Sequence, residues 1–452
     1  MSDTIAAIAT GYQVSAIGII RLSGDRAIEI MDRVFRPFVG APMSARRDRT
    51  LVFGELHELS GALLDVCLCT VSHAPNTYTG EDTAELQCHG SPTVLRAALQ
   101  ELFKAGARQA TGGEFTKRAF LNGRMELTTA EAVIDLIDAE NIESAKNAAA
   151  QLSGAVAKKT EKIYTLLMDI SAHYHAVLDY PDEDIEDFTL AGYSSSLDEA
   201  VRELRRLLGT FERGKLMNSG IPAAIVGRPN AGKSSLLNAL LGYERAIVTD
   251  IPGTTRDTIE ERLRMGGITL RLCDTAGIHE TTDTVEKLGV ERSRRAMQSA
   301  ELVFVLIDGS AEITDEDYSL LREAEKAKSA ILVISKADLS AECAIPETKL
   351  PVVRISSLTG EGLDKLEQTV QEIFPLPEVP AGEILTNARQ AEAVSRALES
   401  MDAALSAMQS GCTPDIVLTE TESAMAALGE LSGKSVREDV TARIFQRFCV
   451  GK

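Results

Sequence analysis

The chain has 452 residues and a formal net charge of -20, and this length is enough for roughly three domains. Hydrophobic residues make up 44% and charged residues 25% of it, the balance of a folded protein and not of a disordered one. The acidic charge excludes tight, sequence-independent binding of nucleic acid by the whole surface, because phosphates are neutralised by lysine and arginine. Short arginine clusters at 46–49 and 292–295 leave a local contact with a polyanion open.

The seven cysteines are odd in number and lack CxxC spacing. This pattern disfavours both a disulfide framework and structural zinc, and it favours a reducing compartment. The N-terminus lacks the basic segment that begins a signal peptide. The longest apolar runs, such as 302–307, are far too short to cross a bilayer. We therefore expect a cytoplasmic protein with no membrane partner.

Residues 1–118 alternate short apolar runs with turn residues. The runs AIGIIRLSG, LVFGEL, LLDVCLCTV and DTAELQCHG predict strands, and 92–106 predicts a helix, so this region is expected to be α+β. A helical stripe of apolar residues then extends from Val133 to Leu152. Long amphipathic helices are expected to continue to about Lys215 and to return after a proline-rich linker at 374–382.

The central segment, 221–374, repeats a strand, a glycine-rich turn and a helix. Strands of β-branched residues alternating with helices predict a mostly parallel sheet covered on both faces. The simplest interpretation is one helical domain interrupted by an inserted α/β domain, because insertion is tolerated where chain ends lie close together. The expected divisions are 1–118 for the N-terminal domain, 119–215 and 381–452 for the two helical parts, and 216–380 for the insertion.

The stretch GRPNAGKSSLLNAL contains the phosphate-loop pattern GxxxxGKS between a predicted strand and a predicted helix. Backbone N–H groups of 230–235 would bind the α and β phosphates, Lys233 would reach the β and γ phosphates, and Ser234 would hold Mg²⁺. A second motif, DTAG, ends another strand and would lie beside the metal and the γ-phosphate. The contacts predicted from the two motifs are Asn230, Ala231, Gly232, Lys233, Ser234, Ser235, Asp274, Thr275, Ala276 and Gly277.

The motif SKAD ends a further strand and favours GTP over ATP. Asp338 can accept hydrogen bonds from N1–H and the 2-amino group of guanine, and adenine has neither. The usual first residue of this motif is Asn, so we expect Ser335 to give weaker base affinity. The segment SSL would close over the base. The predicted base contacts are Ser335, Lys336, Asp338, Ser356, Ser357 and Leu358.

The segment TDIPGTTRD is the predicted switch, with Thr255 completing the Mg²⁺ shell. A glutamine after DTAG orients the attacking water in Ras-like proteins, but Ile278 occupies that position here and can neither donate nor accept. Asn230 offers an oxygen where a monovalent cation would stabilise the charge between the α and γ phosphates. The switch residues predicted to contact the nucleotide site are Thr249, Asp250, Ile251, Pro252, Gly253, Thr254 and Thr255.

With these residues in place, essentially the whole chain resembles the tRNA modification GTPase family MnmE, also called TrmE. The phosphate loop, the switch, GEFTKRAFLNGRMELTTAEAVIDLI and the terminal FCVGK recur in that family. The related Era and EngA GTPases share the middle segment only. The resemblance implies an α+β N-terminal tetrahydrofolate-binding domain that dimerises, a discontinuous all-α helical domain, and an inserted Ras-like α/β P-loop G domain with a mostly parallel sheet.

The resemblance also implies residue roles. The K⁺ ligands would be Asn230, Thr249, Ile251 and Thr254, and the Mg²⁺ ligands Ser234 and Thr255. The catalytic residues would be Lys233, the water-orienting Glu286, and Cys449, which the modification requires. The folate contacts would be Arg21, Glu85, Arg124 and Lys452. In place of the family's PPGRGG-like loop this chain has GYQVSA, which leaves contacts near that loop open.

The activity implied is K⁺-dependent GTP hydrolysis coupled to tRNA modification. With its FAD-dependent partner MnmG, also called GidA, in a heterotetrameric complex, the homodimer would add an aminomethyl or carboxymethylaminomethyl group to C5 of the wobble uridine of certain tRNAs. The carbon would come from 5,10-methylene-tetrahydrofolate, for which 5-formyl-tetrahydrofolate is an analogue. The alternative is a regulatory GTPase switch in ribosome or RNA assembly, which needs neither a folate pocket nor a thiol. A dynamin-like membrane protein is disfavoured, because CVGK is not a prenylation box.

Overall fold

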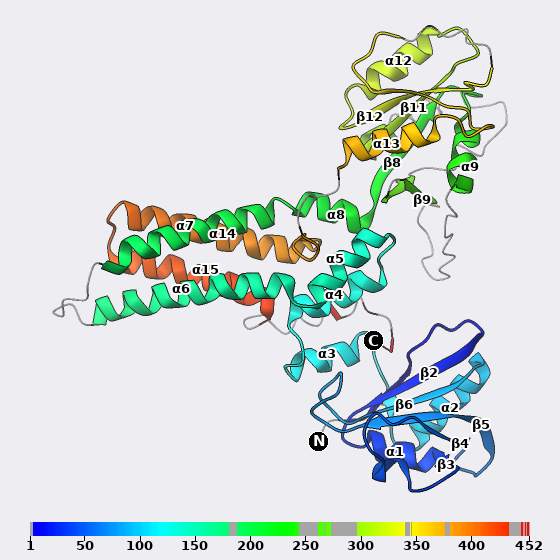
Figure 1. Cartoon of the computed structure of the whole chain (residues 1–452), viewed down its shortest axis with the longest axis vertical. Helices are drawn as coiled ribbons and strands as arrows, with labels where there is room; N and C mark the ends of the chain where they lie inside the picture. The colour runs from blue at the N-terminus through cyan, green and yellow to red at the C-terminus, as the bar shows by residue number, and fades with distance from the viewer. Residues whose placement is uncertain are drawn as a thin grey trace. The chain divides into compact units, whose positions relative to one another are not determined.

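The computed structural model describes residues 3–179, 188–243, 261–265, 267–272, 296–339, 344, 346–375, 380–433, 444–445, 448 and 450–451. The chain forms two compact units. The first contains Met1–Ile137, Ala149–Arg202 and Ala393–Lys452, and the second contains Asp138–Ala148 and Glu203–Glu392. The helices and strands are labelled in Figure 1. None of the described helices is both long enough and apolar enough to cross a membrane.

The N-terminal part of the first unit is a seven-stranded sheet in the order β3-β4-β5-β6-β2-β1-β7 (Figure 1). Neighbouring strands are antiparallel, except that β1 and β7 are parallel. The helices α1 and α2 pack on the sheet around buried residues such as Leu22, Leu86 and Leu95. The elements are β1 Ile5–Ile8, β2 Ser15–Ser23, α1 Ala27–Val34, β3 Phe35–Pro37, the 3₁₀ turn Met43–Ala45, β4 Val52–His57, β5 Leu63–Ser72, β6 Thr83–Gly90, α2 Pro92–Lys104 and β7 Arg108–Gln109.

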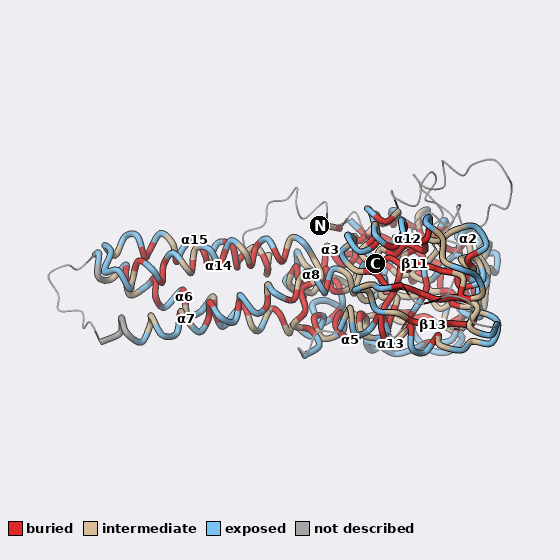
Figure 2. The backbone as a smooth tube through the Cα atoms, turned by 90° about the horizontal axis from the view of Figure 1, so that it is seen from above, coloured by how far each residue is buried: buried red, intermediate tan, exposed pale blue. Residues whose placement is uncertain are grey.

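The rest of the first unit is helical, and four long helices, α6, α7, α14 and α15, run alongside one another (Figures 1 and 2). Their buried residues recur at helical spacing, as Leu197, Val201 and Leu204 do on α7. The stripe expected from Val133 to Leu152 is not one helix, because the chain leaves the helix between α4 and α5. The helices are α3 Glu114–Leu121, α4 Leu127–Ile137, α6 Ala155–Asp179, α7 Phe188–Leu208, α14 Ala388–Gln409 and α15 Pro414–Ser432. Most of α5, Ile142–Leu152, belongs to the second unit.

The second unit contains a six-stranded sheet in the order β13-β12-β11-β8-β10-β9. All neighbouring pairs are parallel except β10 with the edge strand β9. The prediction of a mostly parallel sheet is therefore confirmed. The elements are α8 Phe211–Ser219, β8 Ile221–Gly227, α9 Lys233–Tyr243, β9 Glu261–Met265, β10 Ile268–Leu272, β11 Leu302–Asp308, α12 Asp315–Ala324, β12 Ala330–Ser335, β13 Val352–Arg354 and α13 Leu363–Ile373.

Strand β11 shows why this sheet is buried on both faces. Alternate side chains of a strand point to opposite faces. Phe304 and Leu306 join a core with helices α9 and α13, whereas Val303 and Val305 join a second core with α12. A run that is apolar at every position is therefore required here. The carboxyl ends of β8 and β12 lie at the same edge of the sheet and carry the predicted nucleotide motifs.

Candidate functional site

The phosphate loop lies between the end of β8 and the start of α9, as the sequence predicts. Asn230 and Gly232 adopt positive φ angles of 64° and 95°, a conformation that glycine and asparagine tolerate best. The loop curls around the side chain of Lys233, whose Nζ donates to the carbonyl oxygens of Gly227 and Arg228, each at 2.8 Å. The ammonium group is thus held at the mouth of the loop.

The electrostatics of this loop suit an anion. Burial lowers the pKa of Lys233, and the carboxylate of Glu316 opposes that shift. The first N–H groups of α9 have no partner within the helix, so they add positive potential at the same place. Ser234 is half-buried and Ser235 is exposed on the first turn. This donor set fits a nucleotide triphosphate with Mg²⁺ held near Ser234.

The end of β12 is joined to the phosphate loop by Ser335. This side chain is buried, and its Oγ donates to the carbonyl oxygen of Ala231 at 2.7 Å, with the carbonyl oxygen of Ile307 at 3.2 Å as a second acceptor. The two motifs are about a hundred residues apart in sequence, and this contact brings them together. Because this hydroxyl donates to the phosphate loop, Ser335 helps to position the loop. The sequence did not reveal this role.

The residues after β12 form the predicted base site. Ser356, which is buried, donates from Oγ to Oδ1 of Asp338 at 2.6 Å and so orients this exposed carboxylate. Lys336 has a φ of 56° and pairs through Nζ with Asp308. Ser357 is half-buried, and Leu358 is exposed beside it. The carboxylate of Asp338 is therefore presented to solvent in a fixed orientation.

Asp308 was not predicted as a site residue. Burial raises the pKa of its carboxyl group, but the ammonium of Lys336 and the N–H and O–H of Ser310 outweigh burial and lower that pKa. The ion pair fixes the side chain of Lys336 beside the predicted base site. The only signal in the sequence is the position of Asp308 at the end of an apolar strand, where parallel sheets carry their ligand-binding groups.

Much of the predicted site lies outside the described residues, and the roles assigned to those residues stay predictions. They are Thr249, Asp250, Ile251, Pro252, Gly253, Thr254, Thr255, Asp274, Thr275, Ala276, Gly277, Glu286, Cys449 and Lys452. Of the predicted K⁺ ligands the structure describes Asn230. It is exposed, and its side chain has no hydrogen-bond partner within the described part of the chain. Its neutral amide oxygen fits a hard monovalent cation.

Two of the predicted folate residues face each other in the N-terminal sheet. Arg21 on β2 is the register partner of Glu85 on β6, and their Nε and Oε1 atoms are 2.7 Å apart. About a quarter of each side chain is exposed. The guanidinium carbon of Arg21 also lies 5.9 Å from the ring centroids of both Tyr78 and Phe115. A charged pair beside an aromatic ring fits a flat heterocycle with a donor edge.

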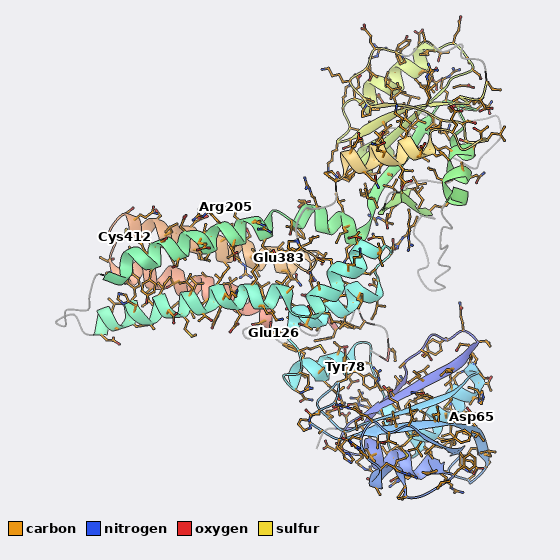
Figure 3. All side chains as sticks on the ribbon, in the orientation of Figure 1. Asp65, Tyr78, Glu126, Arg205, Glu383 and Cys412 are labelled. Atoms are coloured by element: carbon orange, nitrogen blue, oxygen red, sulfur yellow. The ribbon has the colours of Figure 1, made fainter. Side chains whose placement is uncertain are left out.

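Arg124 lies against the same loop as Tyr78. Its Nε donates to the carbonyl oxygen of Thr77 at 3.2 Å. Gly80 packs so close to it that a Cβ there would lie 3.3 Å from Cγ of Arg124. The loop between β5 and β6 therefore contacts two of the predicted folate residues. Tyr78, labelled in Figure 3, is 40% exposed, and sequence reasoning missed it because a single aromatic residue in a loop has no periodicity.

The end of the chain reaches the same sheet. Val450 forms an antiparallel bridge with Gly112, and Gly451 has a φ of 100°. A Cβ on Gly451 would lie 2.4 Å from the carbonyl oxygen of Ile8 on β1, so only glycine fits this position. Because β1 pairs with β2, and Ala7 is the register partner of Arg21, the terminal segment lies near the predicted folate residues.

The chain is similar along its whole length to known proteins. The family profile described as GTP-binding protein TrmE N-terminus matches residues 4–124, and that of the MnmE helical domain matches 127–449. The protein named tRNA modification GTPase MnmE from Symbiobacterium thermophilum is 40% identical over 455 residues, covering 100% of this chain and 99% of that protein. The protein of the same name from Acetivibrio thermocellus is 42% identical over 458 residues, with coverages of 100% and 99%.

Solved structures match a part of the chain. The G domain of the FeoB iron transporter from T. maritima is 28% identical and covers 34% of this chain and 97% of that one, with a TM-score of 0.25. Era, solved with MgGDPNP and nucleotides of 16S ribosomal RNA, is 27% identical and covers 40% of this chain and 67% of its own, with a TM-score of 0.26.

Proposed function

Because this chain belongs to the tRNA modification GTPase family MnmE, we propose that its GTP hydrolysis drives modification of the wobble uridine of certain tRNAs. The group added at C5 is aminomethyl or carboxymethylaminomethyl. The chain acts as a homodimer with the FAD-dependent protein MnmG, in a heterotetrameric complex in the cytoplasm. The acidic surface of this chain leaves much of the contact with tRNA to that partner.

The observation that carries the GTP part of this proposal is the hydrogen bond from Ser335 to Ala231. It joins the motif that contains Asp338 to the loop that binds the phosphates, so the phosphates meet donors and the guanine edge meets an acceptor. Lys233 and the N–H groups of α9 bind the phosphates. Asp338, oriented by Ser356, accepts from the guanine edge. Guanine is preferred because adenine has no N1–H and no 2-amino group.

Hydrolysis in this proposal depends on a monovalent cation and on Glu286. The side chain of Ile278 has no polar atom with which to orient water, so we assign that task to the carboxylate of Glu286. A K⁺ ion bound at Asn230, Thr249, Ile251 and Thr254 supplies positive charge next to the phosphates. Mg²⁺ is assigned to Ser234 and Thr255. Comparing GTP turnover in K⁺ with turnover in Na⁺ tests the cation assignment.

The N-terminal sheet is assigned to a reduced folate. Glu85 pairs with the donor edge of the pterin, and Arg21, Arg124 and Lys452 bind its acidic or formyl oxygens. When bound, 5,10-methylene-tetrahydrofolate supplies the one-carbon unit, and the flavin of the partner supplies the redox step. The pair of Arg21 and Glu85 is accessible, which supports this assignment. Cys449 is assigned to the modification step, because the described residues on both sides of it, Phe448 and Val450, contact Gly112 of the N-terminal domain.

Titration of the purified full-length chain with 5-formyl-tetrahydrofolate tests this function. We expect the wild type to bind the analogue and Glu85→Gln to bind it about ten- to a hundredfold more weakly, because a hydrogen bond to a charged group is worth about 1.5–3 kcal/mol. The control is Glu29→Gln, which removes an exposed carboxylate of the same domain that pairs with Arg26 and Arg33. It should bind like the wild type.

The same titration separates the proposal from a regulatory GTPase switch in ribosome or RNA assembly. A switch needs GTP binding and hydrolysis but no folate. A wild-type chain that hydrolyses GTP and does not bind the folate analogue would therefore favour the switch. Equal binding of the folate analogue by the wild type and Glu85→Gln would instead show that the folate does not bind at the pair of Arg21 and Glu85.

A further inference from the structure

Three potential metal ligands meet in the N-terminal sheet, and the function proposed above uses none of them. One ligand atom from each of Asp65, Cys67 and Cys88 lies within 4.8 Å of the other two. The register pairs Leu68 of β5 with Gln87 of β6, so the next antiparallel pair is Cys67 with Cys88. Both thiols face the core and are 4% and 2% exposed.

The third group, Asp65, is a fixed oxygen donor. It stands two residues before Cys67 on β5, and therefore on the same face of the sheet. Its side chain is 9% exposed. Oδ1 accepts from the N–H of Val66 at 2.8 Å and from Nδ1 of His89 at 2.7 Å, and Oδ2 accepts from the N–H of His89 at 2.9 Å. A carboxylate oxygen has two lone pairs, so Oδ2 keeps one for a metal ion.

We propose that Asp65, Cys67 and Cys88 bind a zinc ion that joins β5 to β6. Two thiolates and a carboxylate are ligands that Zn²⁺ prefers, and three protein ligands leave the fourth tetrahedral position to water. With metal–ligand distances of about 2.0–2.3 Å, tetrahedral ligand atoms lie about 3.5 Å apart, so the present cluster has to contract by about 1 Å. Binding releases the two thiol protons, and the two thiolates, the carboxylate and Zn²⁺ leave a net charge of minus one.

The burial of the two cysteines favours a divalent cation over separate thiolates. Cys67 and Cys88 are both buried, and their sulfur atoms and the carboxylate of Asp65 lie close together. One divalent cation at this place stabilises both thiolates at once.

The sequence argued against structural zinc because the cysteines lack CxxC spacing. That argument holds for ligands on one short loop. Here the ligands come from two strands, and the antiparallel register brings them together. The cluster is also separate from the predicted folate residues, since Asp65 and Tyr78 lie apart on this domain (Figure 3). On β6, Cys88 is buried with the even-numbered residues, whereas Glu85 points to the other face.

Metal analysis and cobalt substitution of the reduced, full-length chain test this proposal. We expect about one zinc per chain after purification, and a thiolate-to-cobalt charge-transfer band when Co²⁺ is added to metal-free protein. Cys67→Ser, Cys88→Ser and Asp65→Asn should each weaken Co²⁺ binding by about tenfold or more. Cys69→Ser and Cys412→Ser are the controls, because one removes a buried thiol of the same strand and the other an exposed thiol of the helical part. Both should bind like the wild type.

GTP hydrolysis takes place in the second unit, so it shows whether that unit is folded in each variant. Circular dichroism shows whether the N-terminal sheet is folded. If a serine variant fails to fold, the wild-type cobalt band and the release of two protons decide the matter. Wild-type protein without zinc and without a cobalt–thiolate band would overturn the proposal. So would equal Co²⁺ binding by Cys88→Ser and Cys412→Ser, or a Cys67–Cys88 disulfide in metal-free protein that does not bind Co²⁺ after reduction.

Discussion

Asn230 is the described residue to which we assign the choice of cation. It lies in the phosphate loop with a φ of 64°, and its exposed side chain has no hydrogen-bond partner among the described residues. An amide oxygen there can replace one water of a weakly hydrated cation without adding a negative charge next to the phosphates. The left-handed backbone favours asparagine, aspartate or glycine at this position.

Replacing Asn230 with glycine removes this oxygen and keeps the backbone conformation. We expect turnover of GTP in K⁺ to fall on the order of 100-fold, as for the loss of one electrostatic contact with a transition state, and the advantage of K⁺ over Na⁺ to disappear. GTP affinity should change little, because Lys233 and the backbone N–H groups are kept. Steady-state hydrolysis in each salt measures both quantities. Asn238→Ala, on the exposed face of α9, is the control, and a glycine variant that still prefers K⁺ would contradict the assignment.

The sequence reveals site residues in contiguous motifs and misses those assembled by the fold. The phosphate loop and the base motif could be predicted because each binds through neighbouring residues between a strand and a helix. The positioning role of Ser335 could not, because its acceptor, Ala231, lies on a different strand-to-helix connection. Asp308 and the cluster of Asp65, Cys67 and Cys88 were missed for the same reason. Their partners are brought close by strand pairing, and the spacing of residues within one segment does not reveal these contacts.

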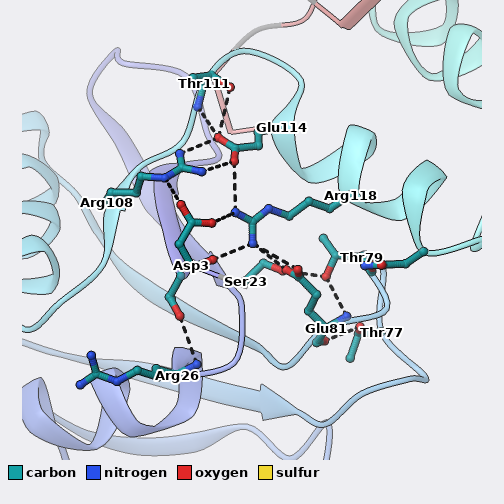
Figure 4. A network of polar contacts seen from close by, with 12 residues as sticks. Asp3, Ser23, Arg26, Thr77, Thr79, Glu81, Arg108, Thr111, Glu114 and Arg118 are labelled. Carbon is teal, nitrogen blue, oxygen red and sulfur yellow. Dashed lines mark hydrogen bonds and ion pairs between the residues drawn. The ribbon is translucent and has the colours of Figure 1, made fainter. Parts of the chain in front are cut away.

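At the scale of elements, a charged network connects the start of β1 to α3 and to the loop before β6 (Figure 4). Arg118 on α3 is buried and donates to Asp3, Glu81 and Glu114. Arg108, at β7, also pairs with Asp3 and Glu114. A buried guanidinium is stable only when its N–H groups are paired. The network therefore fixes α3 on the sheet, and the loss of one carboxylate affects all of these elements.

Glu114 makes the network sensitive to acid. Burial raises the pKa of its carboxyl group, but hydrogen bonds from Arg108, Thr111 and Arg118 outweigh burial and lower the pKa from 4.5 to about 2. A carboxyl group whose pKa is lower in the folded state stabilises the fold above the unfolded pKa, and this contribution is lost as the pH falls from about 4.5 through about 2. The difference in free energy of unfolding between wild type and Glu114→Gln should therefore shrink over that range.

Urea unfolding between pH 3 and pH 7, followed by a probe in the N-terminal sheet, measures this difference. Glu58→Gln is a suitable control, because Glu58 contacts an exposed serine and no arginine among the described residues. A difference between wild type and Glu114→Gln that stays constant with pH would show that the charge of Glu114 does not stabilise the network.

Elements with a long apolar pattern were predicted, whereas short or interrupted ones were not. The strands β2, β4, β5 and β6 and the helix α2 lie where the alternation of apolar residues placed them. β3 and β7 have only three and two residues, too few to show any period. The break between α4 and α5 was missed because the apolar stripe continues on both sides of it. Each helix buries its own part of the stripe, so the pattern alone does not reveal a change of direction.

At the scale of the whole molecule, one helix, α5, makes hydrogen bonds to the chain both where it enters the inserted α/β region and where it leaves it. Near the start of α5, Ser144 Oγ donates to the carbonyl oxygen of Met217 at 2.9 Å, just before β8. One turn later, Asn147 donates from Nδ2 to the carbonyl oxygen of Ile384 at 3.1 Å and accepts at Oδ1 from the N–H of Gly382 at 2.8 Å. The entry and the exit are therefore fixed to the same element, as an insertion requires.

Asn147 is buried, so its replacement with alanine removes the acceptor of the buried N–H of Gly382, away from water. An unsatisfied buried group costs about 1–3 kcal/mol. A local loss of about 2 kcal/mol corresponds to hydrogen exchange on the order of 30-fold faster at the amide of Gly382.

Exchange measured by mass spectrometry on peptides that span 380–385 tests this prediction. The control is Ser153→Ala, which removes an exposed hydroxyl just after α5. Because the phosphate loop and the base motif lie far along the chain from α5, GTP binding should persist in Asn147→Ala. Unchanged protection at Gly382 would mean that the exit of the insertion is held by other contacts.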